Sequence, residues 1–340
     1  MSIVAKAPTR VDLAGGTLDI NPLFRILRNP VTVNIAVDLC AQVEIKRSND
    51  HTFRIKSVDQ GVSFEGSFQD VLSSKDLPLV GLVLAGVWDE KYPALELELS
   101  ALSPKGAGLG GSSCLAVTLV GALDKARQEI VGGELLPPKS LVQIAQDIET
   151  ALIHVPTGCQ DYWGAVNGGL SVIQYPPGSV EVGRIRSSFV EKLSRRMILC
   201  FSGQSRDSGI NNWDIFKAAF DGDLEILAGL NKLGYFANQL VGAFEAERMD
   251  QVLEFSRLEW DIRRELWPNI TTDATQKIHQ TAVAAGAMFT RVCGAGGGGV
   301  MAVFVEEQTM KPVKDALIAA GGQVLDAKVG VPGLAVEGAL

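Results

Sequence analysis

A glycine-rich segment, SPKGAGLGGSS at 103–113, has the residues needed to bind a phosphate group. Glycines let a backbone approach a ligand closely and turn several N–H groups toward it. The two serines at its end begin a predicted helix, whose N-terminus carries unpaired N–H groups and the positive end of the helix dipole. An ordinary glycine turn with a serine cap would need fewer glycines. We therefore predict a phosphate site made by Lys105, Gly106, Ala107, Gly108, Leu109, Gly110, Gly111, Ser112 and Ser113.

Other phosphate-binding motifs fit this segment less well. Gly106, Gly108 and Gly111 satisfy G-x-G-x-x-G, the pattern of a nicotinamide-binding site. That site needs a second strand with an acidic residue ~20 residues later, whereas here a second predicted helix follows GGELLPPKS. The G-K-[ST] triplet of a Walker A loop does not occur, and neither do the H-R-D and D-F-G triplets of protein kinases. A nicotinamide-dependent oxidoreductase is therefore the disfavoured alternative.

Two carboxylates in the segment 149–169 could act beside a bound phosphate. Glu149 lies at the edge of the apolar stripe of a helix predicted over 139–153, where a carboxylate either reaches water or binds a cation. Asp161 follows a Pro-Thr-Gly turn and precedes aromatic residues. A partly buried acid of this kind can accept a hydroxyl proton or pair with a nearby cation.

Two further loops carry residues suited to a ligand. The loop GAGGGG connects two predicted strands, and a loop with almost no side chains leaves room for a bulky ligand or another loop. In the segment APTRVDLAGGTLD, Arg10 could bind a phosphate or a carboxylate, and Asp19 could accept hydrogen bonds from sugar hydroxyls. Each of these charges, taken alone, also fits an exposed turn.

The composition limits the class of protein. The chain has 340 residues, 46% of them hydrophobic, which is enough for one large domain or two. Its formal net charge of −8 argues against a nucleic-acid binder. Because no apolar stretch reaches the ~18–20 residues that span a bilayer, we expect no membrane association. The five cysteines form no C-x-x-C pair, which predicts reduced thiols in a cytoplasmic protein.

The elements that must position these loops indicate an α+β fold. Strands are predicted over 35–47 and 94–100, and in the second the leucines alternate with glutamates, as in a sheet with one solvent-exposed face. The other predicted elements are helices over 112–128, 139–153 and 309–320, a mainly helical region over 209–286, and strands over 170–175, 287–293, 300–305 and 323–329. A weakly patterned break near 176–195 divides the chain into two predicted domains, 1–185 and 186–340.

Four segments in this order resemble the GHMP kinase superfamily, which includes galactokinase, homoserine kinase, mevalonate kinase and phosphomevalonate kinase. APTRVDLAGG is similar to the first motif of the family, PKGAGLGGSS to its phosphate loop and CGAGGGG to its third motif. AGGTLD, PTGCQD and SGQSRDSG most resemble the D-glycero-D-manno-heptose phosphate kinase branch, with fucokinase nearby. The resemblance implies a ribosomal-S5-domain-2-like N-terminal half and a ferredoxin-like α+β C-terminal half with extra helices.

The resemblance also implies roles for individual residues. Ser112 and Glu149 match the protein ligands of Mg²⁺ in the family. Asp161 matches its proposed catalytic base, and Arg10 matches the basic residue near the transferred phosphate. The predicted acceptor-binding residues are Gly16, Thr17, Asp19, Gln160, Arg206, Gly296 and Gly297.

The expected activity is transfer of the γ-phosphoryl group of ATP, with Mg²⁺, to a hydroxyl of a sugar or sugar phosphate. Arg206, a guanidinium in a glycine-flanked turn, is expected to bind an anionic group of the acceptor. Two positions depart from the family: Gly111 replaces the usual Ser or Thr, and Cys159 stands where the heptose kinases often have a basic residue. The alternatives are a mevalonate-type alcohol as the acceptor and a catalytically silent ligand-binding protein on the same scaffold. A homodimer is compatible with the sequence.

Overall fold

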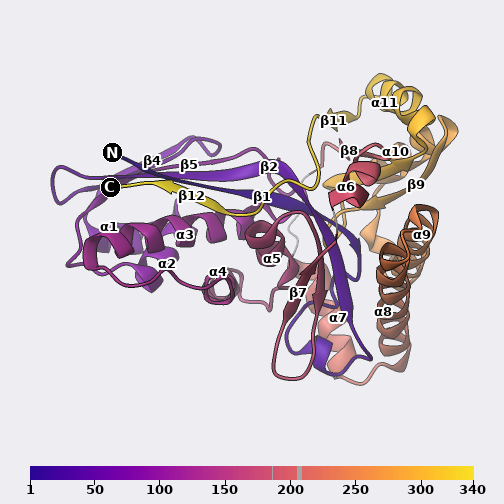
Figure 1. Ribbon diagram of the computed structural model, residues 1–340, viewed down its shortest axis with the longest axis horizontal. Helices are drawn as coiled ribbons and strands as arrows, with labels where there is room; N and C mark the ends of the chain where they lie inside the picture. The colour runs from indigo at the N-terminus through magenta and orange to yellow at the C-terminus, as the bar shows by residue number, and fades with distance from the viewer. Residues whose placement is uncertain (186, 205–208) are drawn as a thin grey trace.

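The computed structural model describes residues 1–185, 187–204 and 209–340. Across these ranges the chain forms two β-sheets with helices packed on them (Figure 1). The strands of the larger sheet are β1 Ile3–Ala14, β2 Val31–Arg47, β3 Phe53–Ser57, β4 Val62–Gly66, β5 Leu95–Ala101, β6 Leu170–Gln174, β7 Glu181–Arg184 and β12 Ala335–Gly338. Their order is β12-β1-β2-β5-β3-β4, with β6 paired to β2 and β7 paired to β6.

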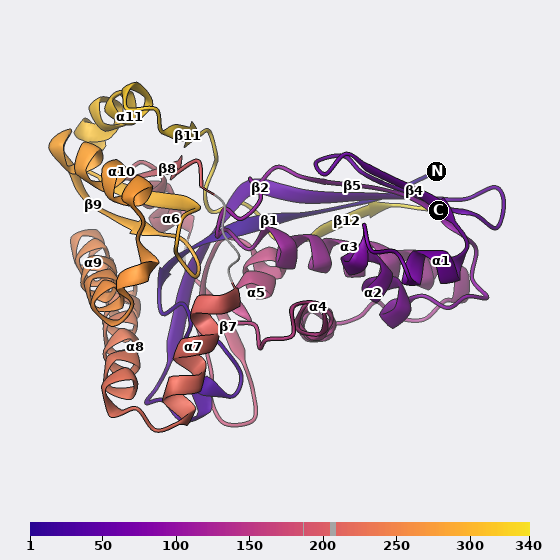
Figure 2. The same ribbon diagram turned by 180° about the vertical axis from the view of Figure 1, so that it is seen from behind.

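Five helices pack on one face of this sheet and leave the other face of β3, β4 and β5 exposed (Figures 1 and 2). They are α1 Phe68–Leu72, α2 Pro78–Val87, α3 Gly111–Val131, α4 Pro138–Ile153 and α5 Gln160–Asn167. In β5, Leu95, Leu97 and Leu99 are buried, whereas Glu96 and Glu98 lie on the opposite face. Successive side chains of a strand point to opposite faces. The predicted sheet with one exposed face is therefore confirmed.

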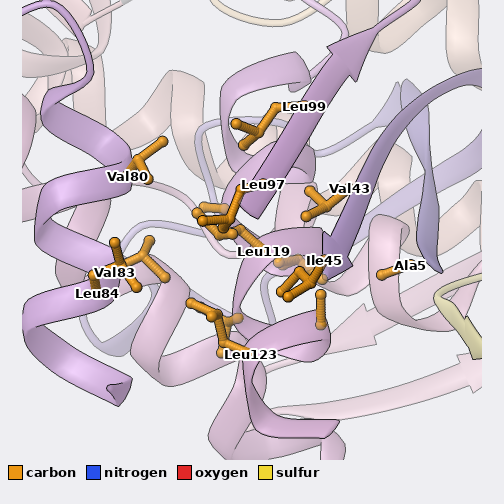
Figure 3. Close-up of a cluster of buried hydrophobic side chains, with 14 of the residues drawn as sticks. Ala5, Val43, Ile45, Val80, Val83, Leu84, Leu97, Leu99, Leu119 and Leu123 are labelled. Atoms are coloured by element: carbon orange, nitrogen blue, oxygen red, sulfur yellow. The ribbon is translucent and has the colours of Figure 1, made fainter. Parts of the chain in front are cut away.

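The core of this half lies between the sheet and the helices α2 and α3. Figure 3 shows Ile45 of β2 and Leu97 of β5 beside Leu119 and Leu123 of α3, with Val83 of α2 in the same cluster. Burial of a large aliphatic side chain contributes ~1.5–3 kcal/mol. This packing fixes α3 on the sheet, and the start of α3 is the end of the predicted phosphate loop.

The C-terminal part of the chain contains a smaller, four-stranded sheet with the order β11-β8-β10-β9. Its strands are β8 Met197–Phe201, β9 Ala287–Val292, β10 Val300–Val305 and β11 Gln323–Leu325. The helices of this part are α6 Ser187–Ser194, α7 Gly209–Phe220, α8 Leu224–Glu245, α9 Met249–Leu266, α10 Asp273–Ala284 and α11 Met310–Ala319. Short 3-10 helices occur at η1 Leu23–Arg25, η2 Pro268–Ile270 and η3 Glu307–Thr309. One buried cluster contains Val33 of β2, Leu240 of α8 and Phe304 of β10, so the two sheets share a core.

The α+β class and most of the predicted elements are confirmed, whereas β1, β3, β4, α1, α2 and α5 were not predicted. The break near 176–195 holds β7 and α6, and the strand predicted over 323–329 ends at Leu325. The four-residue strand β12 was not predicted; it pairs antiparallel with β1, placing Ala335 opposite Lys6. The second predicted domain thus adds a strand to the first sheet, and the boundary at 185 stays a prediction. In the described ranges, no helix combines the length and the apolar character needed to cross a membrane.

Candidate functional site

A cleft of about 900 Å³ lies where β1, the phosphate loop (residues 104–113), α4 and α5 meet. The predicted site residues that line it are Arg10, Gly16, Thr17, Asp19, Lys105, Gly106, Ala107, Gly108, Gly110, Gly111, Ser112, Ser113, Glu149, Gln160 and Asp161. Leu109 is buried beneath the phosphate loop. Arg206 lies outside the described residues. The fold therefore brings most of the predicted site together.

The phosphate loop depends on glycine for its backbone shape and for its close packing. Gly106, Gly108 and Gly110 have φ values of +66°, +74° and +74°, in the left-handed region that favours glycine. A Cβ on Gly108 would lie 2.4 Å from the carbonyl oxygen of Cys293. A Cβ on Gly110 would lie 2.9 Å from Cγ of Asp161. The loop is thus enclosed between the GAGGGG loop and Asp161.

The phosphate loop leads directly into the N-terminus of α3. The N-cap residue is Gly110, and no side chain caps the helix there. The serine cap considered as an alternative is wrong, because Ser112 and Ser113 lie inside the first turn. The first N–H groups of a helix with no side-chain cap, together with the positive end of the helix dipole, attract an anion. The geometry fits the predicted phosphate site.

The GAGGGG loop after β9 packs against the phosphate loop. A Cβ on Gly299 would lie 2.6 Å from the carbonyl oxygen of Ala107, so this glycine makes room for the other loop. That is one of the two outcomes expected from the sequence. Gly296 and Gly297 instead contact Ile270, whose carbonyl accepts the N–H of Gly297 over 2.7 Å. Neither is among the described residues that line the cleft, and their part in acceptor binding stays a prediction.

Arg10 of β1 joins the phosphate loop to Asp161 of α5. Its Nε donates to Oδ1 of Asp161 over 2.7 Å, and its Nη2 lies 2.5 Å from the same oxygen. Its Nη1 donates to the carbonyl of Gly108 over 2.7 Å. Burial lowers the pKa of Arg10, but Asp161 and Asp12 outweigh it and raise the pKa overall. The Arg10 side chain is 4% exposed and that of Asp161 23%, so a ligand can reach the carboxylate more easily than the guanidinium.

Glu149 of α4 is a buried carboxylate at the phosphate loop. Its Oε2 accepts hydrogen bonds from Ser113 Oγ and Tyr162 OH, both over 2.5 Å. Burial raises the pKa of Glu149, and the hydroxyls of Ser112 and Ser113 offset only part of the rise. The carboxylate thus accepts hydrogen bonds from hydroxyl groups, which donate to it without supplying a positive charge.

This arrangement fits Mg²⁺, which prefers oxygen ligands and is commonly held by one or two carboxylates together with phosphate oxygens. Glu149 would supply the carboxylate. Ser112, exposed in the first turn of α3, would supply a hydroxyl. The described residues contain no group of three or more His, Cys, Asp or Glu side chains that could hold a metal ion. A cation here would therefore take its other ligands from phosphate groups and water.

Asp19 follows β1 and meets the N-terminus of α5. It is 2% exposed, and its Oδ2 accepts the backbone N–H of Gln160 over 2.9 Å. Burial raises the pKa of Asp19 to about 6, and the nearby Asp161 adds to the rise. A Cβ on Gly158 would lie 2.1 Å from Oδ2, so only glycine fits at that position. Oε1 of Gln160 is buried and has no hydrogen-bond partner among the described residues. Asp19 and Gln160 both line the cleft, so each could accept a hydrogen bond from a ligand hydroxyl.

Two groups of residues at the site were not predicted. Tyr162 is fully buried and holds Glu149, and its only signal in the sequence was the aromatic pair after Asp161. A network of four buried charges lies beneath the first loop and consists of Asp12, Glu259, Arg263 and Arg291. The spacing of its two helical members, four residues apart, is typical of an exposed helix face. The sequence therefore did not point to this network.

The chain is similar to known proteins over the region that holds the site. It matches the family described as GHMP kinases N terminal domain over residues 80–169. A D-glycero-alpha-D-manno-heptose 7-phosphate kinase of Campylobacter jejuni is 23% identical over 332 residues, covering 96% of each chain. A mevalonate kinase of Thermococcus sibiricus is 24% identical, covering 99% of each chain. The crystal structure of a D-glycero-D-manno-heptose 1-phosphate kinase from Bacteroides thetaiotaomicron superposes with a TM-score of 0.73 at 22% identity, covering 99% of each chain. Residues 80–169 thus match the GHMP kinase N-terminal domain, and the chain shares its two-sheet fold with the heptose 1-phosphate kinase structure.

Proposed function

We propose that the protein transfers the γ-phosphoryl group of ATP to a hydroxyl group of a sugar or sugar phosphate. The observation that carries the proposal is a single cleft in which an uncapped helix N-terminus, a buried carboxylate and the Arg10–Asp161 pair meet. Phosphoryl transfer needs these parts, because it depends on positioning the phosphates, neutralising their charge and orienting the attacking hydroxyl. The match of residues 80–169 to the N-terminal domain of GHMP kinases supports the same reaction.

The nucleotide end of the cleft is the phosphate loop. Its backbone and the first N–H groups of α3 would hold the β- and γ-phosphates, and Lys105 lines the cleft as an added positive charge. Ser112 and Glu149 would hold Mg²⁺, which offsets the negative charge of the phosphates when bound. ATP and Mg²⁺ are thus the proposed cofactors, and the residues of the chain contribute position and charge.

The acceptor end of the cleft contains Asp161. Arg10 engages its Oδ1, which leaves Oδ2 to accept a hydrogen bond from the attacking hydroxyl. We therefore assign Asp161 the orientation of the hydroxyl first, with transfer of the hydroxyl proton to the carboxylate as the new P–O bond forms and the bond from the γ-phosphorus to the departing oxygen of ADP breaks.

The chemistry of the acceptor follows from the oxygens that face it. Asp19 and Gln160 can each accept hydrogen bonds from hydroxyl groups, which a sugar supplies in number. Relatives named for heptose phosphates and L-fucose support a sugar acceptor. The mevalonate kinase relative supports a mevalonate-type alcohol as the second candidate, although such an acceptor has fewer hydroxyl groups to bind. Arg206, outside the described residues, remains our proposed partner for an anionic group of the acceptor.

The nicotinamide alternative has no support in the fold. A dinucleotide site of that type needs a second parallel strand after the first helix. Here α3 is followed directly by α4 and α5, and the strand order β12-β1-β2-β5-β3-β4 is not that of a doubly wound sheet. The glycine pattern at Gly106–Gly111 therefore belongs to the phosphate loop alone.

The cysteines agree with the proposed cytoplasmic location. All five are free and buried. Burial raises the pKa of Cys114 and that of Cys293 to about 12, which keeps both thiols protonated and unreactive. Buried, reduced thiols are typical of proteins in a reducing compartment.

The proposal is tested by a coupled assay of ADP release. The acceptors to compare are heptose phosphates, L-fucose, galactose, uronic acids and mevalonate, each with and without Mg²⁺. We expect Mg²⁺-dependent ADP release with at least one sugar or sugar phosphate. Release with mevalonate alone would select the second candidate, and no acceptor-dependent release, together with thermal stabilisation by NAD(P) only, would overturn both.

A further inference from the structure

The turn Gly15–Thr17 after β1 places Gly16 and Thr17 in the wall of the cleft. Thr17 has a φ of +73°, a backbone conformation that residues other than glycine seldom adopt. Such a conformation persists only where the surrounding structure holds it, and it occurs most often at functional sites. The turn must therefore be held by its neighbours.

Two charged side chains of α9 hold the turn through its backbone. Oε1 of Glu259 accepts the N–H of Gly15 over 3.0 Å. Nη2 of Arg263 donates to the carbonyl oxygen of Gly16 over 2.5 Å. Glu259 and Arg263 also pair with each other over 2.9 Å, and we call these two residues the α9 clamp. One acceptor and one donor, a helical turn apart, thus bind the two ends of the same short stretch of backbone.

The α9 clamp is buried in a network whose charges balance. Arg291 of β9 pairs with Glu259 over 3.2 Å and with Asp12 of β1 over 2.9 Å. All four side chains are at most 2% exposed. Buried ion pairs usually stabilise a fold no better than apolar residues of the same volume. The network is better explained by its hydrogen-bond partners, because three of its hydrogen bonds connect Glu259 and Arg263 to the turn.

We propose that Glu259 and Arg263 are positioning residues that hold the Gly15–Thr17 turn in the shape required by the acceptor. The inference rests on the proposed sugar kinase activity. Gly16 lies between Arg263 and Gln160: a Cβ on Gly16 would be 3.2 Å from Nη2 of the first and 3.2 Å from Nε2 of the second. A shift of Arg263 therefore moves the turn relative to Gln160, at the acceptor end of the cleft.

Arg263→Lys is the direct test, because a lysine keeps the charge but has one nitrogen in place of the two guanidinium nitrogens that contact Gly16, Glu259 and Thr17. We expect the KM for the acceptor to rise ~10-fold or more, since small misplacements at a binding site are costly, and the KM for ATP to change less than about twofold. The matched control is Arg264→Lys, on the exposed side of α9, where Arg264 pairs with Asp261. It should change neither constant.

A purely structural role of Arg263 would give a different result in the Arg263→Lys variant. It would lower the thermal midpoint and the amount of active enzyme while leaving both KM values unchanged. An unchanged acceptor KM in folded Arg263→Lys protein therefore overturns the inference. If the Arg263→Lys variant does not fold, Glu259→Asp tests the same inference. It keeps all four charges of the network but draws the carboxylate back from Gly15 N–H, and the same rise in acceptor KM is expected.

Hydrogen exchange resolved to single amides tests the α9 clamp in the unaltered protein. With no acceptor present, the amide of Gly15 should exchange slowly, because its partner is a buried carboxylate. Fast exchange at Gly15 would show that the turn is not held and would overturn the inference without any variant.

The inference and the proposed function fail in distinguishable ways. If the unaltered protein phosphorylates a sugar and the acceptor KM is unchanged in the variants of the α9 clamp, only the inference is wrong. If the unaltered protein phosphorylates no acceptor, the proposed function is wrong and the inference falls with it.

Discussion

At the scale of single residues, the Arg10–Asp161 pair connects the phosphate loop to the acceptor. Asp161→Asn preserves the size of the side chain and removes its charge. We expect turnover to fall ~10²–10⁴-fold, because an amide cannot take the hydroxyl proton. ATP binding, measured by calorimetry, should change little since the phosphate loop is unaltered. Turnover equal to that of the unaltered enzyme would remove Asp161 from the mechanism.

Tyr162 acts on the proposed cation through Glu149. Tyr162→Phe deletes one of the two hydroxyl groups that hold Oε2 of Glu149. Loss of such an outer partner typically weakens metal affinity ~10–100-fold, and titration of Mn²⁺ in the presence of a non-hydrolysable ATP analogue should show this decrease. Tyr175→Phe is the matched control, because Tyr175 is also buried and donates its hydroxyl to Thr32 over 2.8 Å. Equal metal affinities in the two variants would contradict the prediction.

Asp19 should make the stability of the protein depend on pH. Burial raises its pKa from 3.8 to about 6, so the folded state favours the protonated acid. The stabilisation is fully present below the unfolded pKa and is lost as the pH rises through 6, a difference of ~3 kcal/mol. Asp19→Asn, which is neutral at every pH, should therefore raise the free energy of unfolding at pH 8 but not at pH 4. Urea titrations at the two pH values measure this, and an effect independent of pH would be evidence against it.

At the scale of elements, α3 has a glycine with a positive φ at each end. Gly110 has a φ of +74° and Gly132 a φ of +76°. An alanine at Gly110 has the strain of left-handed backbone, ~1–2 kcal/mol, and an alanine at Gly132, where ψ is −166°, is strained at least as much because only glycine readily adopts that conformation. A Cβ on Gly132 meets nothing within 4 Å, whereas one on Gly110 lies 2.9 Å from Asp161. A substitution at Gly132 thus strains the backbone alone, whereas a substitution at Gly110 also displaces Asp161.

We expect Gly110→Ala and Gly132→Ala both to lower the free energy of unfolding, and only Gly110→Ala to lower turnover strongly. The reason is that Asp161 must move to admit the new methyl group. Thermal unfolding and steady-state kinetics of the two variants provide the comparison. Similar turnover in both would mean that the reaction tolerates a displaced Asp161.

At the scale of the whole molecule, β12 closes one edge of the larger sheet and brings the two labelled chain ends side by side (Figures 1 and 2). Removal of residues 335–340 would uncover the backbone of β1 from Ile3 to Lys6. An uncovered strand edge is a site of aggregation. We therefore expect a lower thermal midpoint and aggregation that increases with protein concentration.

Light scattering during heating measures both effects of that truncation. Removal of residues 339–340 alone is the control, because it leaves the pairing of β12 with β1 in place. An unchanged midpoint in the longer truncation would show that β12 contributes nothing to the sheet. The KM for ATP of the soluble fraction should be unaffected at low temperature, since the phosphate loop is held by α3 and the GAGGGG loop.

The structural features that depend only on residues close together in the sequence were predictable from the sequence. A cluster of glycines followed by two serines and an apolar pattern of helical period defines a loop and then a helix, whatever surrounds them. The alternation of leucine and glutamate in β5 likewise defines which face is buried. Glu149 and Asp161 could be singled out because each stands at an unusual place in its own segment. The phosphate loop and both carboxylates follow from such local rules.

The tertiary structure alone decided which residues meet. Arg10 and Asp161 are 151 positions apart, and no pattern within β1 or α5 names the partner of either. The strand β12 is too short to show an alternating pattern of apolar and polar residues. It forms because its backbone pairs with the edge of β1. Glu259 and Arg263 have the spacing of an exposed helix face, yet they are buried because α9 lies across β1 and β9. Contacts between elements distant in the sequence depend on how the whole chain packs, and the periodicity of apolar residues within one element does not specify that packing.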